Sequence, residues 1–286
     1  MEKSLKWPRR IIFSRKGFDS TAGGVASPIF DDGTMVSMPI PDEQSGVSFA
    51  QVYYRTPFGT TLAEVLPALR CTPAAEDDVH LDPDLRREAR KRRFPDEWLP
   101  IFGQSGGAQA HLENNKVDDL DLFLFYGYFK ALDIDFQRDR NFKEGHVIFG
   151  WLQVGKRYRV NEATRESLRW AADHPHLKEP PSQRVAADLE RRKWKGDNNT
   201  VFVAREHLSF LPSLEGGGIF PTYDTRLCLT AEPSRRSGRS FWVTRPAFLA
   251  QRTKHRQEHV VDVKKSMEAE VKAWLKHIFQ LAKKVS

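Results

Sequence analysis

The sequence is poor in cysteine, with only Cys71 and Cys228 among its 286 residues. Neither belongs to a Cys-x-x-Cys pair or to a Cys/His pair with the spacing of a zinc site. A disulfide framework is therefore not expected, and a cysteine-based zinc site has almost no support. Cys228 lies in the apolar run 226–230, where it is expected to serve as a small hydrophobic side chain.

Long apolar runs are also missing. Residues 1–10 are broken by lysines, arginines and Pro8, so they lack the apolar stretch of a signal peptide. No window approaches the roughly 18 apolar residues that a membrane-spanning helix needs. These absences predict a reducing, cytoplasmic setting and no membrane partner.

The charge balance is mildly basic. Lysine and arginine number 45 against 38 acidic residues, which gives a formal net charge of +7. This sign favours polyanionic partners, with nucleotides or nucleic acid first. Basic patches at 191–195, which contains Trp194, and at 235–239 could contact nucleic acid, although such patches more often only face solvent.

Apolar runs separated by turn residues predict an α+β fold. The expected strands cover residues 10–14, 28–30, 35–38, 120–129, 147–154, 200–204, 226–230 and 241–244. Those at 120–129 and 147–154 are almost continuously apolar, which indicates strands covered on both faces. We expect one domain spanning 1–286, with a mixed, largely antiparallel sheet flanked by helices.

Local signals predict where several elements begin. An Asp-Gly pair between apolar runs favours a hairpin over 28–38. Thr61 and Glu64 form a capping box that predicts a helix to about residue 70. Asp82 followed by Pro83 is typical of a helix start.

Further signals lie in the second half of the chain. Asn161 is expected to cap a helix over 162–172. Gly127 and Gly150 inside the two long strands indicate a bulge or a close approach by another segment. Residues 262–284 have an amphipathic helical pattern, which favours packing on the sheet over binding a partner.

The segment Ser14–Ser20 is the first candidate site. A strand there runs into a loop that carries Arg15, Lys16 and nearby glycines, a combination that can hold a phosphate. Asp19 could orient a substrate hydroxyl or act as a base. The alternative is a surface loop with an Asx turn. The segment has neither P-loop nor dinucleotide-binding spacing, and no serine nucleophile elbow is assigned in the chain.

Alternating imidazole and carboxylate groups make the segment His80–Asp84 the second candidate. His80, Asp82 and Asp84 could share one metal or one substrate. The competing interpretation is an ordinary helix start at Asp82, and no metal site is assigned.

A glycine-rich segment provides the third candidate. Gln104 and Gln109 could recognise the edge of a base, and His111 could transfer a proton. The alternative is a hydrogen-bonded loop without a binding role.

Two histidine pairs are not assigned to a site. His174 and His176 supply only two possible ligands, which do not make a metal site. His255 and His259 lack the glutamate of the metalloprotease motif. Both pairs are expected on solvated surfaces.

Several short segments of the sequence, taken together, resemble a known family. They are Ile12–Ser20, Ser27–Phe30, His80–Asp84, Gly103–Leu112, Leu122–Gly127 and Phe149–Gly155. In this order they are similar to the nucleotide-modification-associated domain family, third type, over about residues 10–248. The resemblance implies a role in DNA base-modification systems without a settled reaction. The family positions that match in this chain include Asp19, His80, Asp82 and His111, so the resemblance implies a functional role for these four residues.

The middle of the chain also resembles the barrel of base-binding domains of the pseudouridine synthase and archaeosine transglycosylase type. In that interpretation the fold is barrel-like in its middle. Tyr126, Tyr128 and Trp151 would then line a pocket for a flipped base. The alternative is that these aromatic side chains belong to the core.

The leading hypothesis is an enzyme, or an enzyme-like nucleotide-binding protein, that acts on a nucleotide or DNA base. The catalytic candidates are Asp19, His80, Asp82 and His111. The candidates for substrate binding are Ser14, Arg15, Lys16, Ser20, Gln104, Gln109, Tyr126 and Trp151. A non-catalytic reader of modified bases and an interaction subunit docking through Trp274 are the alternatives. No cofactor and no partner protein is assigned.

Overall fold

The computed structural model describes residues 5–19, 22–43, 45–132, 142–178, 198–230 and 258–282. Some expectations lie outside this part of the chain: the strand 241–244, the basic patches 191–195 and 235–239, Ser20 and His255.

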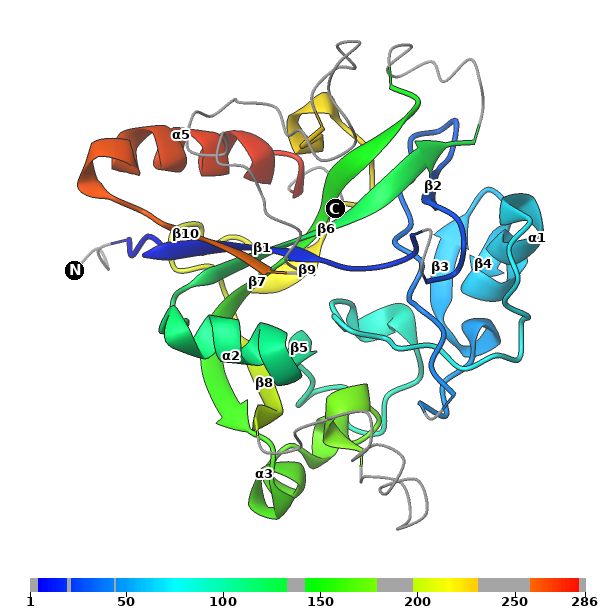
Figure 1. Ribbon diagram of the computed structural model, residues 1–286, viewed down its shortest axis with the longest axis horizontal. Coiled ribbons are helices and arrows are strands. Elements are labelled where there is room, and N and C mark those ends of the chain that lie inside the picture. The colour runs from blue at the N-terminus through cyan, green and yellow to red at the C-terminus, as the bar shows by residue number, and fades with distance from the viewer. Residues whose placement is uncertain are drawn as a thin grey trace.

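An eight-stranded sheet forms the centre of the fold (Figure 1). Its main path runs β10–β1–β6–β7–β8–β5, with β2 beside β6 and β9 beside β7. The strands are β1 (Arg10–Arg15), β2 (Ser27–Ile29), β5 (Ile101–Gln104), β6 (Leu122–Ala131), β7 (Glu144–Arg159), β8 (Thr200–Ala204), β9 (Gly217–Ile219) and β10 (Glu258–Asp262). Strands β1 and β2 run parallel to β6, and the other pairs are antiparallel. The predicted mixed, largely antiparallel sheet is confirmed.

The sheet does not close into a barrel. In the described residues its path ends at β10 on one side and at β5 on the other. The long strand β7 pairs first with β6 and then, past a register shift near Gly155, with β8. This bend brings Phe102 of β5 back over β6, with its ring centroid 5.0 Å from that of Phe123. The barrel-like alternative is therefore wrong, because the sheet folds over itself without joining its edges.

Helices and a small second sheet surround the main sheet. The small sheet pairs β3 (Tyr53–Thr56) with β4 (Gly59–Thr61). The α-helices are α1 (Leu66–Leu69), α2 (Gly106–Asn114), α3 (Glu162–Ser167) and α5 (Glu268–Phe279). Short 3-10 helices cover Phe49–Gln51, Leu62–Val65, Arg87–Ala89, Arg169–Ala171, Pro175–Leu177, Thr225–Leu227 and Lys265–Met267. Figure 1 shows α5 on one side of the β1–β6 layer and α2 on the other. No helix in the described ranges is long and apolar enough to cross a bilayer.

Local sequence signals account for several of these elements. Glu64 accepts hydrogen bonds from the backbone N–H groups of Thr60 and Thr61, which confirms the capping box. Asn161 caps α3 by accepting from the N–H of Thr164. The apolar stripe of α5 is buried, and the Phe279 ring lies 5.2 Å from that of Trp151 on β7.

Three predicted elements are wrong. The strand expected at 35–38 is reduced to an isolated bridge between Met35 and Ile29, although the turn before it forms, with the Gly33 N–H donating to the Phe30 carbonyl. No helix begins at Asp82, because its carboxylate accepts from the Gly103 N–H, the Asp84 carboxylate accepts from Arg92, and the backbone of Asp84 pairs with Ile101. Residues 226–230 form no strand. Asp224 instead caps the 3-10 helix Thr225–Leu227 by accepting from the N–H of Arg226, and a single bridge joins Cys228 to β7.

Candidate functional site

The end of β1 sends successive side chains to different sides of the sheet, as the strand period of two requires. Ser14 faces Glu258 of β10, and its Oγ donates to Glu258 Oε1 at 2.9 Å. Arg15, in register with Tyr126, faces the other way and pairs with Asp19 at 2.6 Å. Lys16 reaches Asp82, so the two predicted phosphate-binding cations have different partners, and their joint role stays a prediction.

Asp82 lies at the centre of a buried polar cluster. Its Oδ1 accepts from the backbone N–H of Gly103 at 2.7 Å, and its Oδ2 lies 3.2 Å from Nζ of Lys16. Burial alone would raise the pKa of Asp82, but the Lys16 ammonium and the His174 and His176 rings outweigh it and hold that pKa below its usual range. Asp82 is therefore an ionised carboxylate in the interior.

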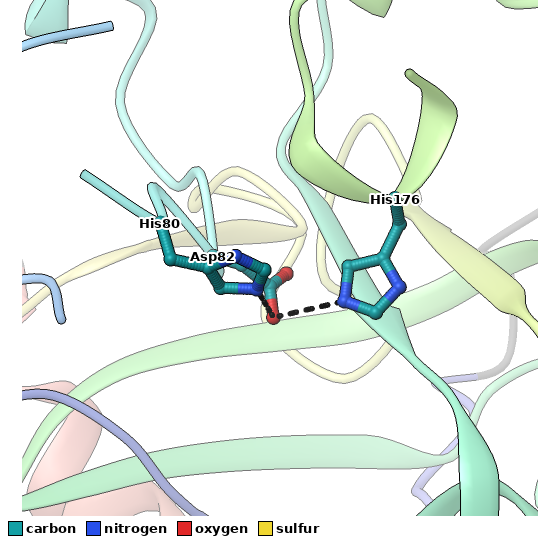
Figure 2. A group of neighbouring side chains, drawn as sticks. All are labelled: His80, Asp82 and His176. Carbon is teal, nitrogen blue, oxygen red and sulfur yellow. Dashed lines mark ion pairs between the residues drawn. The ribbon is translucent and has the colours of Figure 1, made fainter. Parts of the chain in front are cut away.

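Two histidines present nitrogen atoms to Asp82 from different parts of the chain (Figure 2). Nε2 of His80 and Nε2 of His176 lie 4.0 Å and 3.9 Å from Oδ2 of Asp82. Ligand atoms of all three residues lie within 4.8 Å of one another, a spacing that a metal ion can bridge. Burial lowers the pKa of His176 to about 4, so its ring is neutral at physiological pH.

The outer nitrogen of each ring has an acceptor that fixes its tautomer. Nδ1 of His80 lies 2.9 Å from Oδ2 of Asp42. Nδ1 of His176 lies 2.7 Å from Oδ1 of Asn199, whose amide donates to the His176 carbonyl. In neutral His176 the proton therefore lies on Nδ1, which leaves a lone pair on the Nε2 that faces Asp82, while Nδ1 of His80 donates to Asp42.

A third histidine completes the inner wall. His174 is buried, and its Nε2 lies 3.3 Å from Oδ1 of Asp82 without meeting the geometry of a hydrogen bond. Its Nδ1 accepts from the backbone N–H of His176 at 3.4 Å, which places the proton on Nε2. The expectation that His174 and His176 are solvated is wrong, because the 3-10 helix Pro175–Leu177 turns both rings into the interior.

The absence of a side chain at Gly103 makes room for this arrangement. A Cβ atom there would lie 2.3 Å from the His176 ring, far closer than real contacts allow. Glycine at the end of β5 therefore lets one backbone N–H bind Asp82 while the imidazole packs against the same strand.

Glu258 forms a second buried acid beside the first. Its Oε1 accepts from Ser14 and from Nε2 of Gln104, while Oε2 has no hydrogen-bond partner in the described ranges. Burial raises the pKa of Glu258 to about 7, and the positive charge of Lys16 opposes that rise. A carboxyl group with this pKa can change its protonation state near neutrality.

A pocket opens onto Lys16 and Asp82, with a cavity volume of about 70 Å³. Arg86, Tyr54 and Phe149 contribute to its other walls, so it carries positive charge and aromatic surface together. Nζ of Lys16 lies 4.3 Å from the ring centroid of Phe102, so the ammonium also makes a cation–π contact. The pocket lies between the main sheet and the small sheet.

The other predicted site residues have different surroundings. Asp19 accepts from Arg15 and from the N–H of Ala22. On α2, Gln109 is buried and donates to Glu113, while His111 lies 3.4 Å from Nδ2 of Asn115. Catalysis by Asp19 or His111 stays a prediction, as does recognition by Gln109.

The aromatic candidates Trp151 and Tyr126 are both buried. Trp151 is buried against Phe279, and its Nε1–H donates to the carbonyl of Glu215 at 3.1 Å. Tyr126 is buried, and its ring centroid lies 5.3 Å from that of His146. Burial raises the pKa of the Tyr126 hydroxyl well above its usual range. A base-binding role for either residue stays a prediction.

Sequence reasoning missed several members of the cluster. The candidates from the sequence did not include His174, His176, Asn199 or Glu258. A signal was present, because the segments His80-Leu-Asp82 and His174-Pro-His176 each contain two possible metal ligands. Residues 103–107 also have the Gly-x-Ser-x-Gly spacing of a nucleophile elbow, between β5 and α2. Ser105 has extended backbone angles of −144° and 175°, so it is not the strained turn that an elbow requires.

Fold and site together define an α+β protein with a carboxylate, an ammonium and imidazoles buried beside a small pocket. Residues 10–278 match the family model described as nucleotide modification associated domain 3. The chain belongs to this family, and the match extends beyond the range expected from the sequence. No curated protein and no solved structure shows a significant match to the chain.

Proposed function

We propose that the protein binds a nucleotide or a nucleobase at the Lys16–Asp82 pocket and acts on it enzymatically in a base-modification pathway. One observation carries the proposal. In a chain of a nucleotide-modification family, the conspicuous buried ionic cluster lies on the wall of a pocket that also contains Arg86 and two aromatic rings. Buried charge is costly and is common at functional sites.

The pocket offers the two kinds of contact that a nucleotide needs. Lys16 and Arg86 supply positive charge for a phosphate, and the Phe149 ring supplies apolar surface for a base. The Tyr54 ring holds Arg86 in place, with the guanidinium 4.2 Å from its centroid. A cavity of about 70 Å³ holds only a few water-sized groups. The proposed ligand therefore inserts one edge or one phosphate oxygen, and its remainder stays at the mouth.

The two buried acids would divide the chemistry. Asp82 stays ionised and would hold a cation or a polar substrate group. Glu258 is not part of the pocket wall; with a pKa of about 7, it would adjust the charge of the cluster near neutral pH by giving or taking a proton. Lys16 couples them, because its charge lowers the pKa of both carboxyl groups.

A thermal-shift panel tests the proposal. Nucleosides, nucleotides and oligonucleotides with modified bases should be screened, and one of these classes should raise the melting temperature in a concentration-dependent way. The same ligand should fail to stabilise Lys16→Met, while Lys272→Met, a lysine on the outer face of α5, should respond like the wild type. Equal shifts in both variants would refute binding at this pocket.

A further inference from the structure

The geometry points to a divalent transition-metal site formed by Nε2 of His80, Oδ2 of Asp82 and Nε2 of His176, a role distinct from nucleotide binding. These atoms lie within 4.8 Å of one another and come from two separate segments of the chain (Figure 2). Metal–nitrogen and metal–oxygen bonds of about 2.0–2.2 Å place neighbouring ligand atoms about 3–3.5 Å apart. Binding of an ion would therefore draw the three atoms closer together than their present spacing, in which the two nitrogens lie 4.0 and 3.9 Å from Oδ2 of Asp82.

The hydrogen-bonding around the two histidines is that of metal ligands. A ligating histidine donates its outer N–H to a carboxylate or carbonyl oxygen, which fixes the inner lone pair. His80 does so with the carboxylate of Asp42, and His176 does so with the amide oxygen of Asn199. Both inner nitrogens, Nε2 of His80 and Nε2 of His176, face the same oxygen of Asp82.

The carboxylate is also oriented as a ligand. Its Oδ1 accepts from the N–H of Gly103, and the buried Nε2 of His174 approaches the same oxygen. That His174 nitrogen has no well-formed hydrogen bond in the described part of the chain, although the residue is 1% exposed. Oδ1 is thereby occupied by the Gly103 N–H, and Oδ2, which faces both ligand histidines, is the oxygen that would bind an ion.

Lys16 is the competitor for that oxygen. Its Nζ lies 3.2 Å from Oδ2 and neutralises Asp82 when no ion is bound. A bound divalent ion would replace this charge. The positive charge of Lys16 would then act mainly on the second acid, Glu258, whose pKa it already lowers. This competition predicts that removing the Lys16 ammonium strengthens ion binding.

The ligand set identifies the class of ion. Two imidazoles and one carboxylate suit zinc or iron(II) and leave coordination positions for water or substrate. Asp82 lines the pocket, so an ion bound to it would lie next to any molecule held there.

The test uses metal ions alone, on tag-free protein stripped with a chelator and without nucleotide. Cobalt(II) and zinc(II) titrations followed by calorimetry and by the cobalt absorption spectrum should give one ion per chain. X-ray absorption of the zinc form should count two imidazoles. His80→Asn should weaken binding at least about 100-fold, and Asn199→Ala about 10- to 100-fold. Lys16→Met should tighten it.

The control is His207→Asn, which removes an exposed histidine away from the cluster and should leave affinity unchanged. His80 is partly exposed, so its variant is expected to fold, and circular dichroism verifies this. Absence of stoichiometric binding, a spectrum without two imidazoles, or equal affinity in His80→Asn and wild type would overturn the site. None of these outcomes depends on whether a nucleotide binds.

Discussion

The imidazole of His176 packs directly against the backbone of Gly103, where a Cβ atom would lie only 2.3 Å from the ring. Gly103→Ala should therefore push His176 away from Asp82 and lower the free energy of unfolding by about 1–3 kcal/mol, as overpacking does. Chemical denaturation measures this change. Gly107→Ala is the matched control, because nothing lies within 4 Å of its Cβ position, and it should be neutral or slightly stabilising. An equal effect of both substitutions would show that Gly103 makes no special room.

Glu258 predicts a pH dependence of stability. Its native pKa of about 7 lies above the ordinary 4.5, so between these values the native state binds more protons than the unfolded state. The contribution of Glu258 to stability is therefore present at low pH and is lost as pH rises through about 7. Lys16 and Asp82 are the charged groups that act on it.

Glu258→Gln removes this titration and keeps an oxygen for Ser14 and Gln104. The variant should gain stability relative to the wild type between about pH 5 and pH 8, by roughly 1–3 kcal/mol, since one pKa unit is worth about 1.4 kcal/mol. Urea denaturation at several pH values measures the difference. A difference that does not change with pH would show that Glu258 does not titrate in this window.

Asp19 and Asp82 distinguish two versions of the site. Because Asp82 lines the pocket and Asp19 pairs with Arg15, Asp82→Asn should abolish the ligand-induced thermal shift and any turnover. Asp19→Asn should reduce either by less than about threefold, as expected for removal of one partly exposed ion pair outside the pocket. The reverse order of effects would place the site in the loop after β1.

Trp151 separates a core role from base recognition. Its indole packs on Phe279 and donates to the Glu215 carbonyl, so Trp151→Ala should cost about 3–5 kcal/mol of stability. Trp151→Phe should restore most of that stability. If Trp151→Phe instead keeps the fold but loses affinity for modified-base oligonucleotides, and wild-type binding weakens steeply with salt, the protein is a reader.

Much of the fold follows from short-range patterns. Continuous apolar runs predicted β6 and β7, and the residues of the capping box and Asn161 predicted where helical segments start. The site depended on longer-range contacts. The local pattern of His80-Leu-Asp82 favours a helix start, and that of His174-Pro-His176 favours a loop. The two segments meet through the tertiary structure, in which β7 changes partner from β6 to β8 and β8 pairs with β5. Arg15 and Lys16 are adjacent in sequence, and strand alternation separates them in space.

The most direct test of the account is calorimetric titration of the ligand class found by thermal shift into wild type, Lys16→Met and Lys272→Met. Loss of one charged hydrogen bond costs about 1.5–3 kcal/mol, so Lys16→Met should weaken binding about 10- to 100-fold while Lys272→Met binds like the wild type. Circular dichroism verifies that Lys16→Met is folded. Identical nucleotide affinity in all three proteins would contradict the account.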